Sequence, residues 1–189
     1  MTIYVILPGL LLLFIYIIID FIRHRTRNLL WRLIFYSLAF YGIMVLHVTT
    51  GGINIPPRPF PWAPPVQLVP LDIVREMVQG VASRGFVWFG SSTARLNFLN
   101  LLMLMPLGVY LPLLFKVKSV GRVALTAGLV SFFIEVGQMI TTYTGLTRPR
   151  GFNVDDIILN TLGAVLAFLV YRSLSPYLAP VIEKVEKSV

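Results

Sequence analysis

The stretch VALTAGLVSFFIEVGQMITT, residues 123–142, decides the fold class of this chain. It is apolar for about twenty residues, the length an α-helix needs to cross a hydrocarbon core of ~30 Å at ~1.5 Å per residue. Its one charged side chain is Glu135, which comes about twelve residues from the start. The stretch therefore predicts a transmembrane helix that carries a carboxyl group well inside the bilayer.

Four further apolar runs have similar length. The chain has 189 residues, of which 57% are hydrophobic and 13% charged, and ordinary soluble proteins carry nearly twice that share of charge. A cleaved signal peptide is not expected, because no Lys or Arg precedes the first run. Pro106 and Gly108 are expected to kink or loosen the third. The prediction is an all-α integral membrane protein with about five transmembrane helices, the other four at about 3–22, 33–50, 97–115 and 157–174.

The basic residues predict the orientation. Ten of the sixteen Lys and Arg residues flank one set of helix ends, and the remaining six are spread over longer loops at the other ends. By the positive-inside rule the ten face the cytoplasm, which places the N-terminus outside and the C-terminus inside. The net charge of +8 is thus explained by topology, and no nucleic-acid partner is expected. Arg32 should extend to the interface. The ten residues are Arg23, Arg25, Arg27, Arg32, Lys116, Lys118, Arg122, Arg172, Lys184 and Lys187.

The long segment between the second and third runs differs in character. Six prolines between residues 51 and 65 exclude a helix or a central strand there. Residues 70–80 predict a short amphipathic helix, and Phe86-Val-Trp-Phe89 offers aromatic anchors typical of a membrane–water boundary. We interpret 66–90 as an interfacial cap, with a re-entrant hairpin as the alternative. The predicted divisions are 1–52 (two transmembrane helices), 53–96 (extracytoplasmic), 97–175 (three-helix core) and 176–189 (cytoplasmic tail).

Polar side chains gather at the predicted outer ends of the last three spans. A carboxyl group inside a bilayer costs ~2.5–3.5 kcal/mol on insertion scales, so Glu135 should face protein and meet a partner. Gln138 shares its helical face, while Asp156 and Asn160 share another at i, i+4, which Gly163 continues as a close-packing position. The inner halves of the spans carry almost no comparable groups, which favours a ligand site. Its candidate residues are Asn97, Asn100, Glu135, Gln138, Arg148, Arg150, Asp155, Asp156 and Asn160.

Plainer interpretations remain open for these residues. The amides can join helices through hydrogen bonds, and Arg150 with Asp155 or Asp156 can form a rim ion pair that contributes little. The two aspartates with Glu135 could hold a divalent cation; no other cofactor is implied. His47 lacks zinc-site spacing and is interpreted as structural or interfacial. The polar loop Ser91–Thr93 has no His/Asp relay, and the chain has no cysteine nucleophile.

Four groups of motifs occur in order along the chain: Gln67-Leu-Val-Pro70, Asn97-Phe-Leu-Asn100 with Met105-Pro-Leu-Gly108, Ser131-Phe-Phe-Ile-Glu135-Val-Gly-Gln138, and Arg150-Gly-Phe-Asn-Val-Asp155-Asp156 with Ile157-Ile-Leu-Asn160-Thr-Leu-Gly163. In this order and spacing they resemble the VanZ-like family of bacterial membrane proteins, over about Leu68 to Tyr171. Leu104 stands where the family often has phenylalanine. Asn153 stands where it often has aspartate, and this lost charge weakens the cation interpretation. The resemblance implies a role in low-level resistance to teicoplanin and lipid-bearing glycopeptides, without a change in the cell-wall peptide terminus.

Three functions follow as hypotheses, all in the bacterial cytoplasmic membrane. The first is an outer-leaflet pocket, roofed by residues 70–80, that binds the headgroup of a membrane lipid, a lipid-linked envelope precursor or a lipoglycopeptide. The second is an enzyme acting on lipid-linked envelope material, with Glu135 as acid or base and Asp156 ionised beside Arg150. The third is a structural subunit of a membrane complex. The oligomeric state is not predicted.

Overall fold

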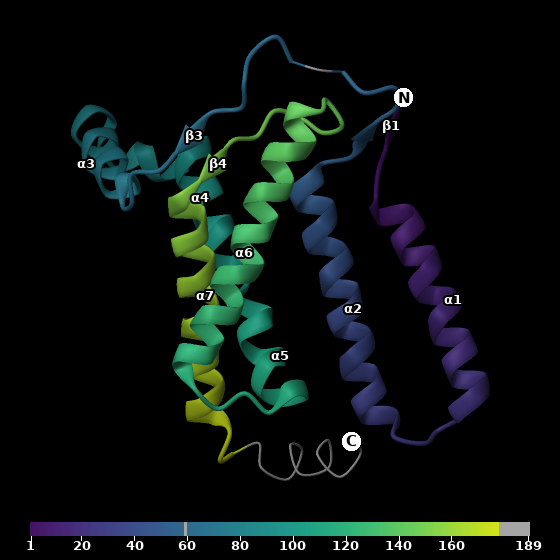
Figure 1. Ribbon diagram of the computed structural model, residues 1–189. Coiled ribbons are helices and arrows are strands. Elements are labelled where there is room, and N and C mark those ends of the chain that lie inside the picture. The colour runs from purple at the N-terminus through teal and green to yellow at the C-terminus, as the bar shows by residue number, and fades with distance from the viewer. Residues whose placement is uncertain (59, 178–189) are drawn as a thin grey trace.

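The computed structural model describes residues 1–58 and 60–177, which are mostly helical (Figure 1). Five helical segments among them are long and apolar enough to cross a membrane. This confirms the predicted all-α, multi-pass membrane fold. The spans are α1 (Ile6–His24), α2 (Leu29–Thr50), the broken span α4 (Ser92–Met103) and α5 (Met105–Phe115), α6 (Val120–Tyr143) and α7 (Val154–Leu174).

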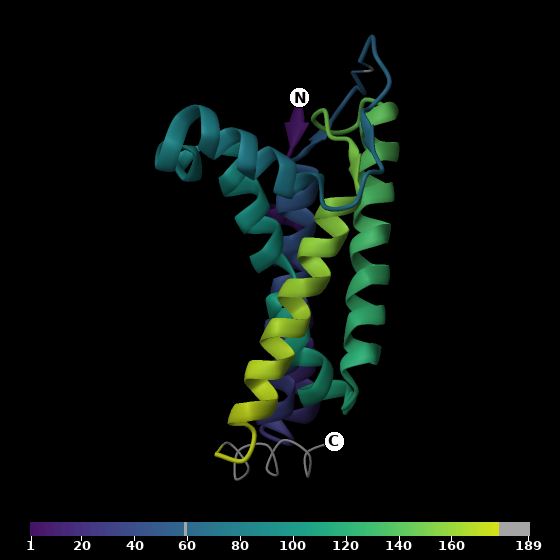
Figure 2. The ribbon, with the colours of Figure 1, turned by 90° about the vertical axis from the view of Figure 1, so that its left-hand side faces the viewer.

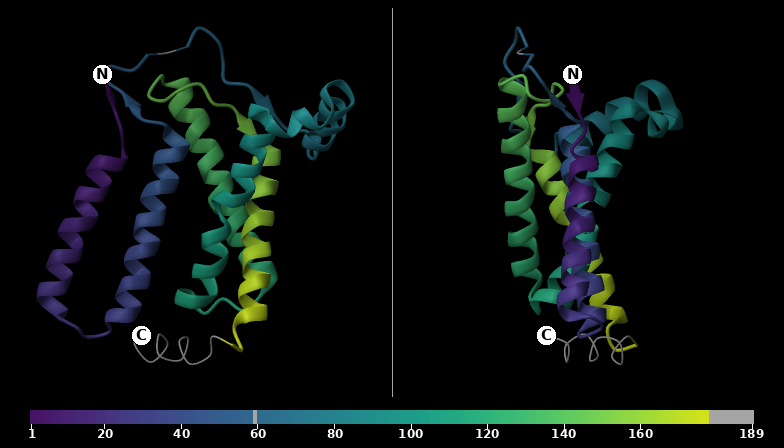
Figure 3. Two further views of the ribbon diagram at one scale, coloured as in Figure 1. Left: turned by 180° about the vertical axis from the view of Figure 1, so that it is seen from behind. Right: turned by 90° about the vertical axis from the view of Figure 1, so that its right-hand side faces the viewer.

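The spans form two groups that lie side by side. Helices α4 to α7 make a bundle, and α1 and α2 form a hairpin against one flank of it (Figures 1 and 3). Two short strand pairs lie at one end: β1 (Thr2–Ile3) pairs antiparallel with β2 (Ile53–Asn54), and β3 (Val66–Gln67) pairs parallel with β4 (Phe152–Asn153). We call this the loop end. That it faces the cell exterior stays a prediction, and Lys184 and Lys187, with all of the predicted tail beyond residue 177, lie outside the described residues.

Helix α7 packs against α4 and α5 with backbone in contact with backbone. A Cβ added at Gly163 would overlap the carbonyl oxygen of Leu101, and one added at Gly108 would overlap that of Ala164. Glycine at these positions lets the helices approach more closely than any side chain would allow. The prediction of close packing at Gly163 is confirmed.

The third span is broken rather than merely bent. Helix α4 ends at Met103 and α5 starts at Met105, with Leu104 between them at φ −100° and ψ 6°. Pro106 lies at the start of α5, where its missing N–H leaves no helical hydrogen bond unmade. The predicted loosening near Pro106 is confirmed. The core lies around this break and consists of Leu104, Leu111, Val123, Ala127, Ala164 and Phe168.

A buried polar cluster joins α1 to α2 near the end opposite the loop end. Arg32 donates from Nε to the Asp20 carboxylate at 2.5 Å, and the Tyr36 hydroxyl donates to the same carboxylate. Arg32 also donates to the carbonyl oxygens of Arg25 and Arg27. The expectation that Arg32 extends to the interface is wrong, because its side chain is 7% exposed. The half of the first two spans that lies away from the loop end is therefore more polar than predicted.

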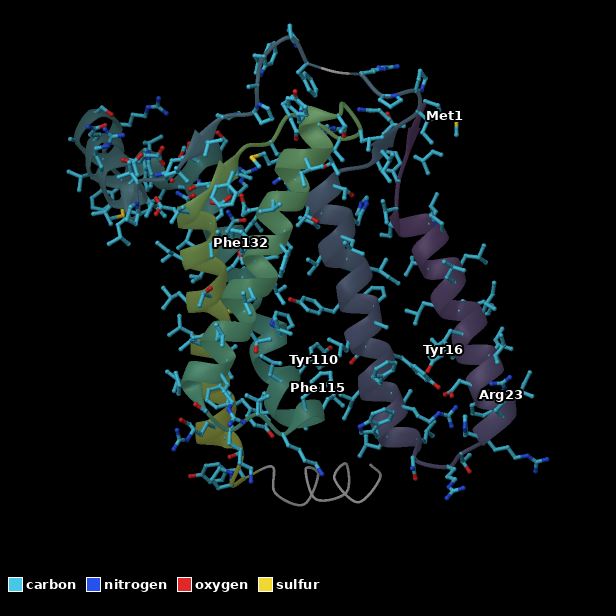
Figure 4. The ribbon with its side chains drawn as sticks, in the orientation of Figure 1. Met1, Tyr16, Arg23, Tyr110, Phe115 and Phe132 are labelled. Carbon is cyan, nitrogen blue, oxygen red and sulfur yellow. The ribbon has the colours of Figure 1, made fainter. Side chains whose placement is uncertain are left out.

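Aromatic side chains also join α1 to α2. Tyr16 lies on the side of α1 that faces α2, and its ring meets that of Tyr36 edge to face at 6.0 Å (Figure 4). From the other side, Tyr110 of α5 donates to the Ser37 hydroxyl of α2 at 3.0 Å. Helix α2 is thus held between α1 and the bundle.

The predicted amphipathic helix is present as α3 (Asp72–Arg84), followed by the 3-10 helix η1 (Gly85–Gly90). These elements run sideways from the loop end, across the direction of the spans (Figure 2). That direction does not match a re-entrant hairpin; contact with a membrane surface stays a prediction. Phe86 and Phe89 are exposed as expected of anchors, whereas Trp88 is buried because its ring packs on Gly80.

Candidate functional site

A cavity of about 410 Å³ lies between α2, α4, α6 and α7 toward the loop end. We call it the helix cavity. Most of its wall is apolar, and its charged and amide side chains come from α4, α6, α7 and the loop before α7. The lining residues are Tyr41, Met44, Val45, Val48, Thr49, Leu96, Leu99, Asn100, Leu102, Met103, Glu135, Gln138, Arg150 and Asp156.

Two carboxyl groups from different helices meet at this cavity. Glu135 of α6 is 3% exposed, and its Oε2 accepts the backbone N–H of Asn153 at 3.0 Å. Asp156 of α7 accepts from the side-chain amide of the same Asn153 at 3.1 Å. The predicted convergence of Glu135 and Asp156 is therefore observed. The second oxygen of Glu135 has no hydrogen-bond donor among the described residues, which leaves it available to a ligand.

The amide and guanidinium groups link the cavity to α2. Gln138 donates to the Thr49 carbonyl at 3.0 Å, and Arg150 makes a longer contact with the Val48 carbonyl at 3.4 Å. The predicted ion pair of Arg150 with an aspartate is not found within 4.0 Å in the described part of the chain. Arg150 still lies close enough to Glu135 and Asp156 for their charges to interact. Asn100 lies beside Asp156.

A second cavity of about 480 Å³ adjoins the first at the loop end. We call it the loop cavity. It is built largely from the segment between α6 and α7, which β4 fixes against β3, and from the end of the proline-rich segment. Thr142 holds that segment by accepting the backbone N–H of Arg150 at 3.0 Å. The lining residues are Pro65, Gln67, Leu96, Gln138, Arg148, Pro149, Arg150, Gly151, Phe152, Asn153 and Asp156.

Three predicted site residues line neither cavity. Asp155 is buried, and its carboxylate accepts the backbone N–H groups of Leu71 and Ile73 at 2.6 and 2.8 Å, so it fixes the start of α3. Asn160 is fully buried and donates to the Ser131 hydroxyl at 2.9 Å, joining α7 to α6. Asn97 has a buried side-chain nitrogen without a partner among the described residues. For Asp155 and Asn160 the structural interpretation fits better than ligand binding.

Four further expectations concern the roof of the cavity, a metal ion, His47 and the loop Ser91–Thr93. None of residues 70–80 lines the helix cavity, so the expected roof is wrong: α3 leads away from it (Figure 2). The described residues contain no group of three or more His, Cys, Asp or Glu able to hold a metal ion. The His47 ring packs edge to face on Tyr4 at 6.1 Å, as a structural residue would. Ser91 caps α4 by accepting the Ala94 N–H.

Sequence reasoning missed the wall supplied by α2. Tyr41, Met44 and Val45 contribute to it, and the Tyr41 hydroxyl donates to the Met103 carbonyl at 2.8 Å across the cavity wall. No local pattern marks these residues, because an apolar side chain that faces a cavity looks the same in sequence as one that faces lipid. In the sequence Asn153 stands out only as a missing charge, whereas in the structure it donates to both carboxyl groups.

The chain is similar to a known protein family over most of its length. A family model described as VanZ/LLP1 matches residues 10–175, nearly the whole chain. The match begins within α1 and ends just after α7, so it includes every residue of both cavities. No match was found among curated proteins or solved structures.

Proposed function

The chain belongs to the VanZ/LLP1 family, and from this membership and the helix cavity we propose that it binds an amphiphile, with the polar headgroup held at Glu135, Gln138, Arg150 and Asp156. The amphiphile is a membrane lipid, a lipid-linked envelope precursor or a lipoglycopeptide. We further propose that the protein resides in the bacterial cytoplasmic membrane with the loop end outside, as the distribution of basic residues predicts.

One observation carries this proposal: a single cavity joins an apolar wall to a cluster of charged and amide groups. Cavities of about 300–1,000 Å³ with mostly apolar walls and few polar groups are typical of small-molecule sites, and this one measures about 410 Å³. Buried carboxyl groups at membrane depth are costly and indicate function by default. An amphiphile would match both halves of the cavity at once.

Filling the apolar half should abolish binding. We expect Val45→Trp to reduce retained lipid by at least about tenfold, because the indole would occupy space that the ligand needs. The chain is reconstituted in nanodiscs of total bacterial polar lipid, extracted in mild detergent, and the lipid that stays bound is counted by native mass spectrometry. The matched control is Leu46→Trp, the next residue of α2, which is exposed and lines neither cavity.

Equal retention by both tryptophan variants and the wild-type chain would contradict the proposal. The same pair tests the resistance role. Expression of the wild-type chain in a susceptible bacterium should raise the minimal inhibitory concentration of teicoplanin. The Leu46→Trp variant should do the same and the Val45→Trp variant should not.

The meeting of two carboxyl groups favours one second candidate. Glu135 and Asp156 come from different helices, share Asn153 as a donor and border the same cavity. Carboxyl pairs in unlike environments serve as acid and base in many enzymes. The alternative proposal is therefore an enzyme that acts on lipid-linked envelope material, with Glu135 transferring a proton.

A further inference from the structure

The two cavities adjoin and share part of their lining. They share four lining residues: Leu96, Gln138, Arg150 and Asp156. The helix cavity extends from these residues among the spans, and the loop cavity extends from them into the segment after α6. A ligand that passes this junction has one part among the helices and another at the loop end.

Polarity and charge differ between the two cavities. The wall that belongs only to the helix cavity is mainly aliphatic and Met side chains, whereas the loop cavity adds Gln67, Asn153 and Arg148. Arg148 lines only the loop cavity and Glu135 only the helix cavity. Positive charge is therefore in excess at the loop end and negative charge among the helices, which assigns an anionic group to the loop cavity.

Arg148 and Arg150 are exposed, and their guanidinium groups have few partners among the described residues. Neither Arg148 nor Arg150 forms an ion pair within 4.0 Å in residues 1–58 and 60–177. Beyond the 3.4 Å contact of Arg150 with the Val48 carbonyl, neither guanidinium makes a hydrogen bond to the described residues. A guanidinium presents a planar fork of donors that matches the oxygens of phosphate, and two forks can share one group.

We propose that the ligand is a phosphate-bearing amphiphile, its phosphate between Arg148 and Arg150 in the loop cavity and its hydrocarbon chain in the helix cavity. This inference rests on the proposed function and names its ligand class. Glu135 and Asp156 then accept hydrogen bonds from hydroxyl or amide groups between chain and phosphate. Their negative charge keeps the phosphate from moving deeper among the helices.

The test compares three probes that share one chain. Purified wild-type protein in dodecyl maltoside is mixed with hexadecyl phosphate, hexadecyl trimethylammonium or hexadecanol, and bound copies are counted by native mass spectrometry. We expect hexadecyl phosphate to bind at least about tenfold more tightly than either other probe, because hydrogen bonds between charged groups contribute most. Equal or tighter binding of the trimethylammonium probe or of hexadecanol would overturn the assignment.

Paired substitutions locate the phosphate. Arg148→Ala/Arg150→Ala should lose about tenfold or more in affinity for hexadecyl phosphate, and Arg148→Lys/Arg150→Lys should lose less, since lysine keeps the charge without the fork. The control Arg23→Ala/Arg27→Ala removes two exposed charges at the opposite end, where Figure 4 labels Arg23, and should bind as wild type. If the alanine pair does not fold, the lysine pair and the wild-type probe series still decide.

Competition with inorganic phosphate distinguishes a phosphate-bearing lipid from free phosphate as the ligand. Inorganic phosphate should not displace hexadecyl phosphate at equal concentration, because most of the binding surface is apolar. Displacement would contradict the proposal that the ligand carries a hydrocarbon chain. If no probe binds, but the wild-type chain still retains more bacterial lipid than Val45→Trp does, only the phosphate assignment fails. Equal lipid retention by the wild-type chain and Val45→Trp would instead contradict the proposed function.

Discussion

Replacing Gly163 by alanine should prevent the bundle from folding. The added Cβ would overlap the backbone carbonyl of Leu101, and a backbone cannot rotate aside as a side chain can. Overpacking in a well-packed core costs ~1–3 kcal/mol and occasionally more, and we expect this position to lie at the upper limit because α7 contacts α4, α5 and α6. The measurement is the yield of monodisperse protein by size-exclusion chromatography, with the midpoint of thermal unfolding for whatever remains.

Two glycines in other helices serve as matched controls. No atom of the described residues outside the local helix lies within 4 Å of a Cβ added at Gly42 in α2 or at Gly137 in α6. Alanine at either position should keep or slightly raise stability, because glycine is the poorer helix former by ~1 kcal/mol. Normal yield and an unchanged midpoint for Gly163→Ala would show that the close approach of α7 to α4 is wrong.

Replacing Glu135 by glutamine should separate the two candidate functions. The glutamine carbonyl can still accept the Asn153 N–H, so the fold and the loop cavity should persist. We expect lipid retention within about threefold of wild type, a change of less than about 1 kcal/mol. Should the wild-type chain convert a lipid-linked substrate, the same variant would lose ~10²–10⁴-fold in rate, since an amide does not transfer protons. Both quantities come from mass spectrometry of the bound and released lipid.

The alanine variant supplies the contrast. Glu135→Ala leaves the Asn153 N–H without its acceptor, which costs ~1–3 kcal/mol where the group is buried. Retention should then fall in the alanine variant and persist in the glutamine variant. Equal loss of retention in both, with both folded, would mean that the negative charge itself holds the ligand.

The fold was largely predictable because its signals are local. Length and apolarity identified the spans, and Pro106 marked the position of the break in the third span. The convergence of Glu135 with Asp156 was also predictable, since each is an expensive polar group at the same depth of a neighbouring helix.

What the sequence did not reveal depends on which helices become neighbours. Arg32 appeared as an interfacial cation because its partner Asp20 lies in another helix, across a turn whose geometry no pattern specifies. Asp155 appeared as a ligand group for the same reason. The N–H groups that it binds belong to Leu71 and Ile73, which come 84 and 82 positions earlier in the chain. The wall supplied by α2 carries no charged side chain that would have marked it in the sequence.

Helix α2 supplies one wall of the helix cavity, and hydrogen bonds made by Tyr41, Gln138, Arg150 and Tyr110 join it to the rest of the molecule. The charged groups at this cavity come from α6, α7 and the segment between them, and α4 adds Leu96, Leu99, Leu102 and Met103 to the apolar wall. If the cavity holds an amphiphile as proposed, α2 would contact mainly its hydrocarbon tail, whereas the bundle would contact both tail and headgroup. Changes confined to α2 would then alter which tails fit while the headgroup contacts are kept.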